Sequence, residues 1–327
     1  MAADATVSED RRRAKRGRKW LFLAAKLAII AAVAWGIRGT LTDGIEQLRH
    51  ADFTIRWDWL ALSAAVYILA NLPAGWFWWY AMLSVGQRLG FYRAFRGYVI
   101  GHLGKYVPGK ALVVVMRAAF VRSETADGGI AAACVFMETF TLMASGALLA
   151  AIVLAFSFQQ HLWFSLLALA LAAATFGPTW PPLFRYVVRR LGVGKRDPNI
   201  DAKLSGLTGR VVLVGWLTTS LTWVLYGISL WAVLMAVGID SYSLSESIVS
   251  LTATSALSVV AGFASLIPGG LGVRDAVLIE MLRPFLASAN VGNVEAAALS
   301  TAILLRLVWL VGEVVAAAGL YVVRPKA

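Results

Sequence analysis

The sequence predicts an all-α, polytopic membrane protein, and three observations carry that prediction. Of its 327 residues, 59% are hydrophobic and 15% are charged, against about 45–50% and about 25% in soluble domains. Several apolar stretches reach the length of about 20 residues that a helix needs to cross a hydrocarbon core. Thirteen tryptophans fit the same setting, because Trp gathers at membrane–water interfaces. This composition excludes an ordinary soluble enzyme and a disordered chain.

Six transmembrane helices are expected, at 20–37, 57–85, 128–156, 162–180, 211–237 and 296–323. A basic tail precedes the first of them, so a signal peptide with a cleavage site near Ala32-Val33-Ala34 is an alternative. The apolar run after that tail exceeds the usual h-region of about 7–15 residues, which favours a retained first helix. The expected organisation is therefore a cytoplasmic tail (1–19), one transmembrane domain (20–323) and a cytoplasmic C-terminus (324–327).

Two further apolar segments, 94–121 and 247–287, are interrupted by Pro-Gly pairs at Pro108-Gly109 and Pro268-Gly269. The arms of the first reach only about 20 Å each, too short to cross a membrane. The arms of the second are longer, so two full spans remain an alternative there. Because lipid does not tolerate free backbone groups, such breaks lie inside protein or line a wet cavity. We expect both segments to be re-entrant helical hairpins.

The basic residues indicate sidedness. With a cytoplasmic N-terminus, the inside segments hold 21 of the 30 Lys and Arg, as the positive-inside rule requires. The net charge of +12 therefore indicates orientation rather than a surface for nucleic acid. In this orientation a span–hairpin–span unit occurs twice with opposite topology, at about 57–156 and about 211–323. Inverted repeats with interrupted helices are typical of secondary transporters; a duplicated scaffold without transport is the alternative.

Charged residues at membrane depth cost at least about 2.5–3.5 kcal/mol each, so each requires a role. The second arm of each hairpin starts with free N–H groups, and glycines there let the backbone approach a ligand, which suits an anion such as a lipid phosphate. We expect anion binding by Lys105, Gly109, Lys110, Gly269, Gly270, Gly272, Arg274 and Arg306. Ion pairing or proton coupling is expected for Glu138, Asp275, Glu280 and Glu313. Arg306 can pair with Glu138 or with Glu313, and Arg117 and Arg283 are equally consistent with snorkelling to an interface.

No catalytic constellation is apparent. Cys134 is the only cysteine, and none of the three histidines has metal-ligand spacing, so neither a metal nor another cofactor is expected. No nucleophile motif or nucleotide-binding loop stands in a credible setting. A transporter without enzymatic activity is therefore favoured. The alternatives are an integral lipid-modifying enzyme, an accessory subunit of a lipid or cell-envelope synthesis complex, and an interaction scaffold for such enzymes.

The segments 101–110 (GHLGKYVPGK) and 267–275 (IPGGLGVRD) resemble the two motif regions of the lysylphosphatidylglycerol synthase transmembrane family. This flippase-like family includes the membrane half of the bacterial multiple peptide resistance factor, and the resemblance extends over about 21–323. It implies lipid translocation in a bacterial or archaeal cell membrane, with two re-entrant hairpins forming the headgroup path. The positions that match the family pattern are Lys105, Pro108, Gly109, Lys110, Pro268, Gly269, Gly270, Gly272 and Arg274.

Two features limit what that resemblance implies. Family members often carry Glu where this chain has Asp275. The printed chain ends at Ala327, just after the last expected span, so we expect neither an aminoacyl-transferase domain nor lysyl transfer. The expected partners are membrane lipids with phosphate headgroups, and a second copy or a lipid-synthesis enzyme is an alternative partner. Phospholipids, polyprenyl-phosphate glycolipids and hopanoid-type lipids all remain open as the substrate.

Overall fold

The computed structural model describes residues 55–106, 111–123, 125–157, 162–190, 200–267, 270, 272–289 and 291–323. Every regular element in these ranges is a helix, which confirms the all-helical class for this part of the chain. Several predictions fall outside the ranges: the basic tail, the first span, the C-terminal 324–327, and the break residues Pro108, Gly109, Lys110, Pro268 and Gly269.

Within the described ranges, five helices are long and apolar enough to cross a membrane: α2 (Trp57–Ser84), α5 (Gly128–Ser157), α9 (Gly209–Ala236), α10 (Leu244–Ala264) and α12 (Val294–Val322). Four of them lie at expected spans. The fifth, α10, was expected to be the first arm of a hairpin. The expected span at 162–180 corresponds to α6 (Leu162–Thr179), a helix of 18 residues. The chain is thus a multi-pass membrane protein.

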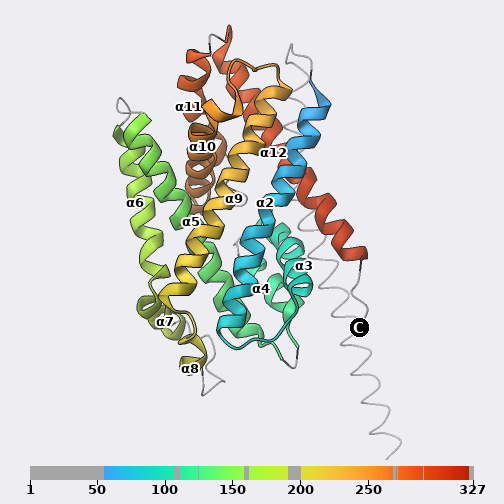
Figure 1. The fold of residues 1–327 in the computed structure, drawn as a ribbon, viewed down its shortest axis with the longest axis vertical. Coiled ribbons are helices and arrows are strands. Elements are labelled where there is room, and N and C mark those ends of the chain that lie inside the picture. The colour runs from blue at the N-terminus through green and yellow to red at the C-terminus, as the bar shows by residue number, and fades with distance from the viewer. Residues whose placement is uncertain are drawn as a thin grey trace, which may run out of the picture.

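Two helical hairpins stand between the long helices in the chain and lie toward opposite ends of the bundle (Figure 1). The first consists of α3 (Phe91–His102), the 3-10 turn η1 (Leu103–Tyr106) and α4 (Ala111–Val121); the second consists of α10 and α11 (Val273–Ser288). Helices α3 and α4 have 12 and 11 residues, so each is only about 16–18 Å long. Helices α10 and α11 have 21 and 16 residues, so the arms of the second hairpin are unequal and longer than those of the first.

Helices α2 and α9, of 28 residues each, run antiparallel through the centre of the structure. At one end, the Ser63 hydroxyl donates to the carbonyl oxygen of Ser229 at 2.8 Å. Further along, Gly215 leaves room for the ring of Phe77, because a Cβ atom there would lie 2.3 Å from the ring. Small and hydroxyl-bearing residues of this kind let membrane helices pack closely.

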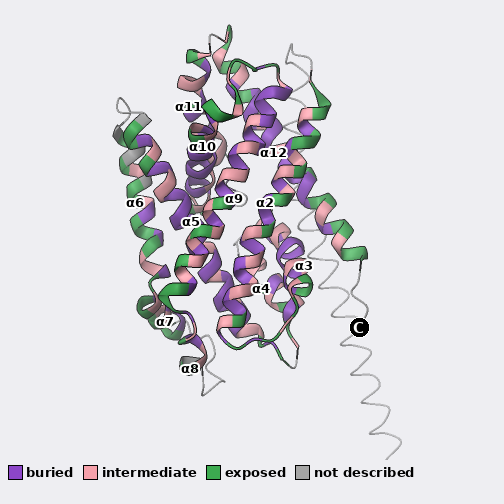
Figure 2. Ribbon diagram, viewed as in Figure 1, coloured by how far each residue is buried: buried purple, intermediate pink, exposed green. Residues whose placement is uncertain are grey.

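The outer surface carries large apolar side chains, as a lipid-facing surface should. On α9, Leu213, Leu217 and Leu221 are exposed at four-residue intervals and form one stripe along the helix. Buried residues gather on the inner helices, while exposed residues mark α6 and several helix ends (Figure 2). A contiguous apolar stripe this long indicates contact with hydrocarbon rather than with water.

Polar side chains fix where several helices begin. Asp127 accepts hydrogen bonds from the backbone N–H groups of Gly129 and Ile130 and so caps α5. Glu246 accepts from the backbone N–H of Ser243 at 2.8 Å, as in a capping box, at the start of α10. These caps satisfy N–H groups that a helix leaves without partners.

The connection between the expected spans at 162–180 and 211–237 contains α7 (Pro181–Arg190) and α8 (Ile200–Leu204). Phe184 and Val188 lie four residues apart on one face of α7 and are buried in the core that α2 and α3 also form. The apolar residues of this connection therefore anchor it against the bundle.

Candidate functional site

A cavity of about 420 Å³ lies where the two hairpins approach each other. Lys105 and Arg117 reach it from the first hairpin, and Gly270 and Arg274 reach it from the second. Helices α2, α5, α9 and α12 complete its wall. Leu266 lines the cavity and is 72% exposed, so the cavity opens to the surface beside the break after α10.

Basic side chains gather at one part of this cavity. His102 Nε2 lies 3.1 Å from Lys105 Nζ, and His102 Nδ1 lies 3.2 Å from Arg117 Nη2. Arg117 donates to Glu138 at 2.7 Å, and Lys105 donates to Glu313 at 2.5 Å, so both of these cations are paired with carboxylates.

Arg274 differs from the other two cations. Its guanidinium group stacks over the ring of Trp309 at 4.4 Å from the centroid. Its Nε is buried without a hydrogen-bond partner, and no carboxylate in the described part of the chain pairs with it. Arg274 lines the cavity, so the other N–H groups of its guanidinium can donate to an anion there. Arg274 is therefore the cation that an anionic ligand would contact first.

Most of the remaining wall is hydrocarbon. It consists of Val113, Val114, Val135, Phe136, Phe140, Leu142, Met143, Val259, Phe263 and Leu266. A cavity with a charged part and an apolar wall matches a ligand that is itself amphipathic. A small hydrophilic anion would leave the apolar part of the wall in contact with water.

Each cavity arginine on the second arm of a hairpin packs against a glycine on the first arm. A Cβ atom at Gly101 would lie 2.5 Å from the Arg117 Cγ, and one at Gly262 would lie 2.9 Å from the Arg274 Cβ. The sequence interpretation did not single out either glycine. The available signal was their spacing, seven and six residues before Pro108 and Pro268.

Replacing Gly262 with alanine is expected to displace Arg274 and to lower the free energy of unfolding by about 1–3 kcal/mol, the usual cost of overpacking. Gly319→Ala is the matched control, because a Cβ atom there meets nothing within 4 Å and alanine favours the helix. Thermal unfolding can be followed by the reaction of a thiol dye with Cys134, the single, buried cysteine. Equal stability of the two variants would contradict this packing.

Of the anion-binding residues expected from the sequence, Lys105, Gly270 and Arg274 line the cavity, whereas Gly272 and Arg306 do not. Gly272 precedes α11 with a φ of +78°, which favours glycine, and its N–H donates to Asp275. Arg306 donates to Asp275 at 2.9 Å.

The expected pairing of Arg306 with Glu138 or Glu313 is therefore wrong, since those carboxylates pair with Arg117 and Lys105. Glu280 is exposed and pairs with Arg283, so it lies on the surface rather than in the cavity.

The snorkelling interpretation of Arg117 is also wrong, because this residue is only 2% exposed. Aromatic residues that the sequence interpretation did not select complete the site: Tyr67, Tyr98, Tyr226 and Trp309. Tyr67 stacks on Trp309 with ring centroids 4.4 Å apart, and the Tyr98 hydroxyl donates to Glu138. In the described part of the chain, no three His, Cys, Asp or Glu side chains gather as a metal site requires.

The fold and the cavity together define a helical, multi-pass membrane protein with an internal cavity whose wall is partly charged and mostly apolar. The chain belongs to the family described as lysylphosphatidylglycerol synthase TM region, whose profile matches residues 23–317. Comparisons with curated proteins and with solved structures gave no match. Membership of this family gives the protein a membrane function that is related to lipids.

Proposed function

We propose that this protein moves an anionic or phosphate-bearing lipid or glycolipid between the two leaflets of its membrane. The cavity is the observation that carries this proposal. Its basic part suits a phosphate, its apolar wall suits the adjoining hydrocarbon, and Leu266 marks an opening to the surface. Arg274 contacts the phosphate directly, because guanidinium groups bind phosphate oxygens with two donors at once.

The proposed path runs between the two hairpins. Helices α3 and α4 enter the membrane and return to the same side, since neither is long enough to cross it. The order α2, hairpin, α5 is repeated as α9, hairpin, α12, and we propose that the two units form an inverted repeat about the α2–α9 contact. Rocking of one unit against the other would expose the cavity to each leaflet in turn.

The orientation follows from the basic residues rather than from the structure. The proposal places both termini in the cytoplasm and the protein in the cell membrane, with inside segments rich in Lys and Arg. It retains the family-pattern residues of the two breaks as binding residues: Pro108, Gly109, Lys110, Pro268 and Gly269.

The test is the translocation of fluorescent phosphatidylglycerol in proteoliposomes, measured as the fraction of label that an external reductant cannot reach. Replacing Arg274 with glutamine is expected to slow translocation roughly tenfold or more, because a hydrogen bond to a charged group contributes about 1.5–3 kcal/mol. Arg283→Gln is the matched control, since Arg283 lies on the same helix but pairs with Glu280 and Glu295 at the surface. Equal rates in both variants, the natural chain and protein-free vesicles would overturn the proposed function.

A further inference from the structure

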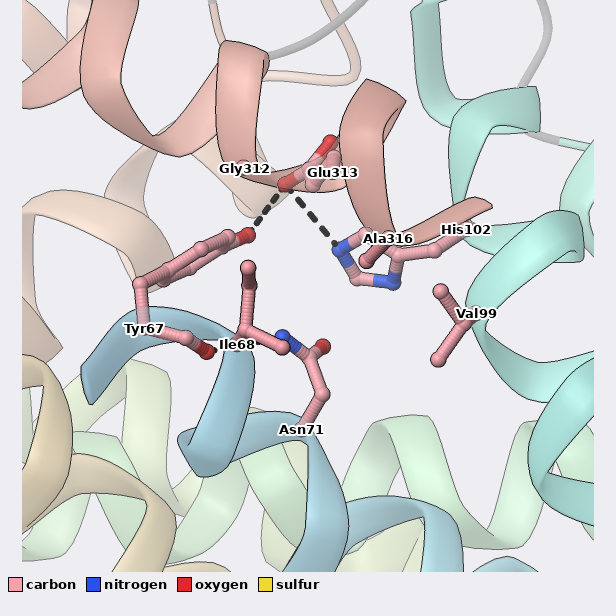
Figure 3. Close-up of a pocket in the computed structure, with 8 residues that line it drawn as sticks. All are labelled: Tyr67, Ile68, Asn71, Val99, His102, Gly312, Glu313 and Ala316. Atoms are coloured by element: carbon pink, nitrogen blue, oxygen red, sulfur yellow. Dashed lines mark hydrogen bonds and ion pairs between the residues drawn. The ribbon is translucent and has the colours of Figure 1, made fainter. Parts of the chain in front are cut away.

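Glu313 lies between two hollow spaces in the fold. One is the cavity between the two hairpins, called the lipid cavity below, and the other is a crevice of about 10 Å³ beside α2, α3 and α12 (Figure 3). Tyr67 and His102 line both spaces, whereas Glu313 lines the crevice. The crevice has about the volume that a single water molecule occupies, and Asn71 adds a polar amide to its wall.

The two oxygens of this carboxylate have different surroundings. Oε1 accepts hydrogen bonds from the Tyr67 hydroxyl and from Lys105 Nζ, and His102 Nε2 lies 3.7 Å away. Oε2 is buried and has no hydrogen-bond partner. A buried carboxylate oxygen without a donor is costly. The Tyr67 hydroxyl and the Lys105 ammonium group therefore hold this carboxylate through Oε1.

In the described part of the chain, charged and titratable groups approach Glu313 from four elements. Those with an interaction on Glu313 are Tyr67 on α2, His102 on α3, Lys105 and Tyr106 on η1, and Tyr226 on α9. Arg274 on α11 lies near this group and acts on Lys105, Tyr106 and Tyr226. Among them, Lys105 both pairs with Glu313 and lines the lipid cavity. Protonating Glu313 removes the charge that holds Lys105, so the ammonium group becomes available to an anion in the cavity.

We propose that Glu313 is a proton-binding site coupled to the headgroup site. In the empty protein, ionised Glu313 pairs with Lys105. When a phosphate binds Lys105 and Arg274, Glu313 takes up a proton from water through the crevice, and that proton leaves when the phosphate does. No bond of the lipid changes. By linkage, a bound proton strengthens phosphate binding as much as bound phosphate strengthens proton binding. The inference rests on the proposed function in taking the anion to be a lipid headgroup.

The experiment measures proton uptake on ligand binding by the full chain in detergent, in weakly buffered solution with a pH indicator. Short-chain phosphatidylglycerol is the probe, and uptake of up to about one proton per bound lipid is expected from complete coupling. Glu313→Gln is expected to bind lipid without proton uptake. Glu295→Gln, a surface carboxylate at the start of the same helix, is the control that should behave as the natural chain does.

A second probe and a second substitution distinguish the possible causes of proton uptake. Glycerophosphoglycerol, the free headgroup of the lipid, is used as a second probe because its phosphate is a diester, as in the lipid. Uptake with this probe as well as with lipid supports the coupling and shows that the headgroup suffices; uptake with lipid alone also supports it and shows that the acyl chains are needed. Binding of lipid to the natural chain without proton uptake overturns the proposal, whatever the variants do. If Glu313→Gln fails to fold, Glu313→Asp, which keeps a titratable carboxyl, is expected to show uptake, and its absence there counts against the site.

The failure of the coupling can be told apart from the failure of the proposed function. Fluorescent lipid that crosses the membrane at a rate insensitive to a pH gradient, with no proton uptake, would remove the coupling and leave the transport function. Proton uptake on lipid binding without any translocation would remove the transport function and leave the coupling.

Discussion

Replacing Arg117 with methionine is expected to lower the free energy of unfolding by about 3–5 kcal/mol, the cost of leaving one partner of a buried ion pair alone. Arg117 and Glu138 are each only 2% exposed, and their charged atoms lie 2.7 Å apart. Without the guanidinium group, the donors that remain to the Glu138 carboxylate among the described residues are the hydroxyls of Tyr98 and Thr139. The temperature at which Cys134 becomes reactive toward a thiol dye, measured in detergent, reports the loss.

A double variant distinguishes a lost ion pair from lost packing. Arg117→Met combined with Glu138→Leu is expected to be more stable than Arg117→Met alone, since apolar replacement of both partners is often nearly neutral. Because Arg117 also stacks over Tyr98 at 3.8 Å, part of the loss should remain. A double variant whose loss equals or exceeds the sum of the single losses would show that the pair is not the source of the stability.

Much of the helical framework could be predicted from the sequence because length and hydropathy are local properties. Helices α2, α5, α9 and α12 follow from apolar runs that hold few charges. The structure of α10 shows where that reasoning stops. Its 21 residues are long enough to cross a membrane, yet the Pro-Gly pair after it made a short hairpin arm equally reasonable. Whether a helix of this length crosses or returns depends on its neighbours, which the local sequence does not encode.

The sequence predicted which charged residues belong to the candidate site, but it did not predict which of them form ion pairs. Charges at membrane depth identified Lys105, Glu138, Arg274 and Glu313, because each is too costly to retain without a role. Their partners depend on tertiary packing: Lys105 and Glu313 are 208 residues apart and meet only because η1 packs against α12.

Aromatic contributors were harder to find. Tyr67 and Trp309 look like ordinary core residues in the sequence, and only the fold brings them to the cavity together. An aromatic residue in an apolar helix carries no signal of its own that separates packing from ligand binding.

Replacing Trp309 with alanine is expected to lower the free energy of unfolding by about 3–5 kcal/mol and to weaken binding of short-chain phosphatidylglycerol. Trp309 is 3% exposed, stacks on Tyr67 and donates its indole N–H to Ser229 at 2.9 Å, so its loss opens a large hole between α2, α9 and α12. Its ring also orients the Arg274 guanidinium, and that contact contributes about 0.5–2 kcal/mol in sites of this kind.

Trp309→Phe separates these two effects. Phenylalanine keeps a ring beneath Arg274 but loses the hydrogen bond to Ser229, so a smaller stability loss is expected with most of the lipid affinity retained. Trp57→Ala, at a position that is 73% exposed, is expected to change the free energy of unfolding by no more than about 0.5 kcal/mol. Unfolding is read from Cys134 reactivity and affinity from lipid titration. Lipid affinity equal to that of the natural chain in a folded Trp309→Ala protein would show that Arg274 is held in place without the ring.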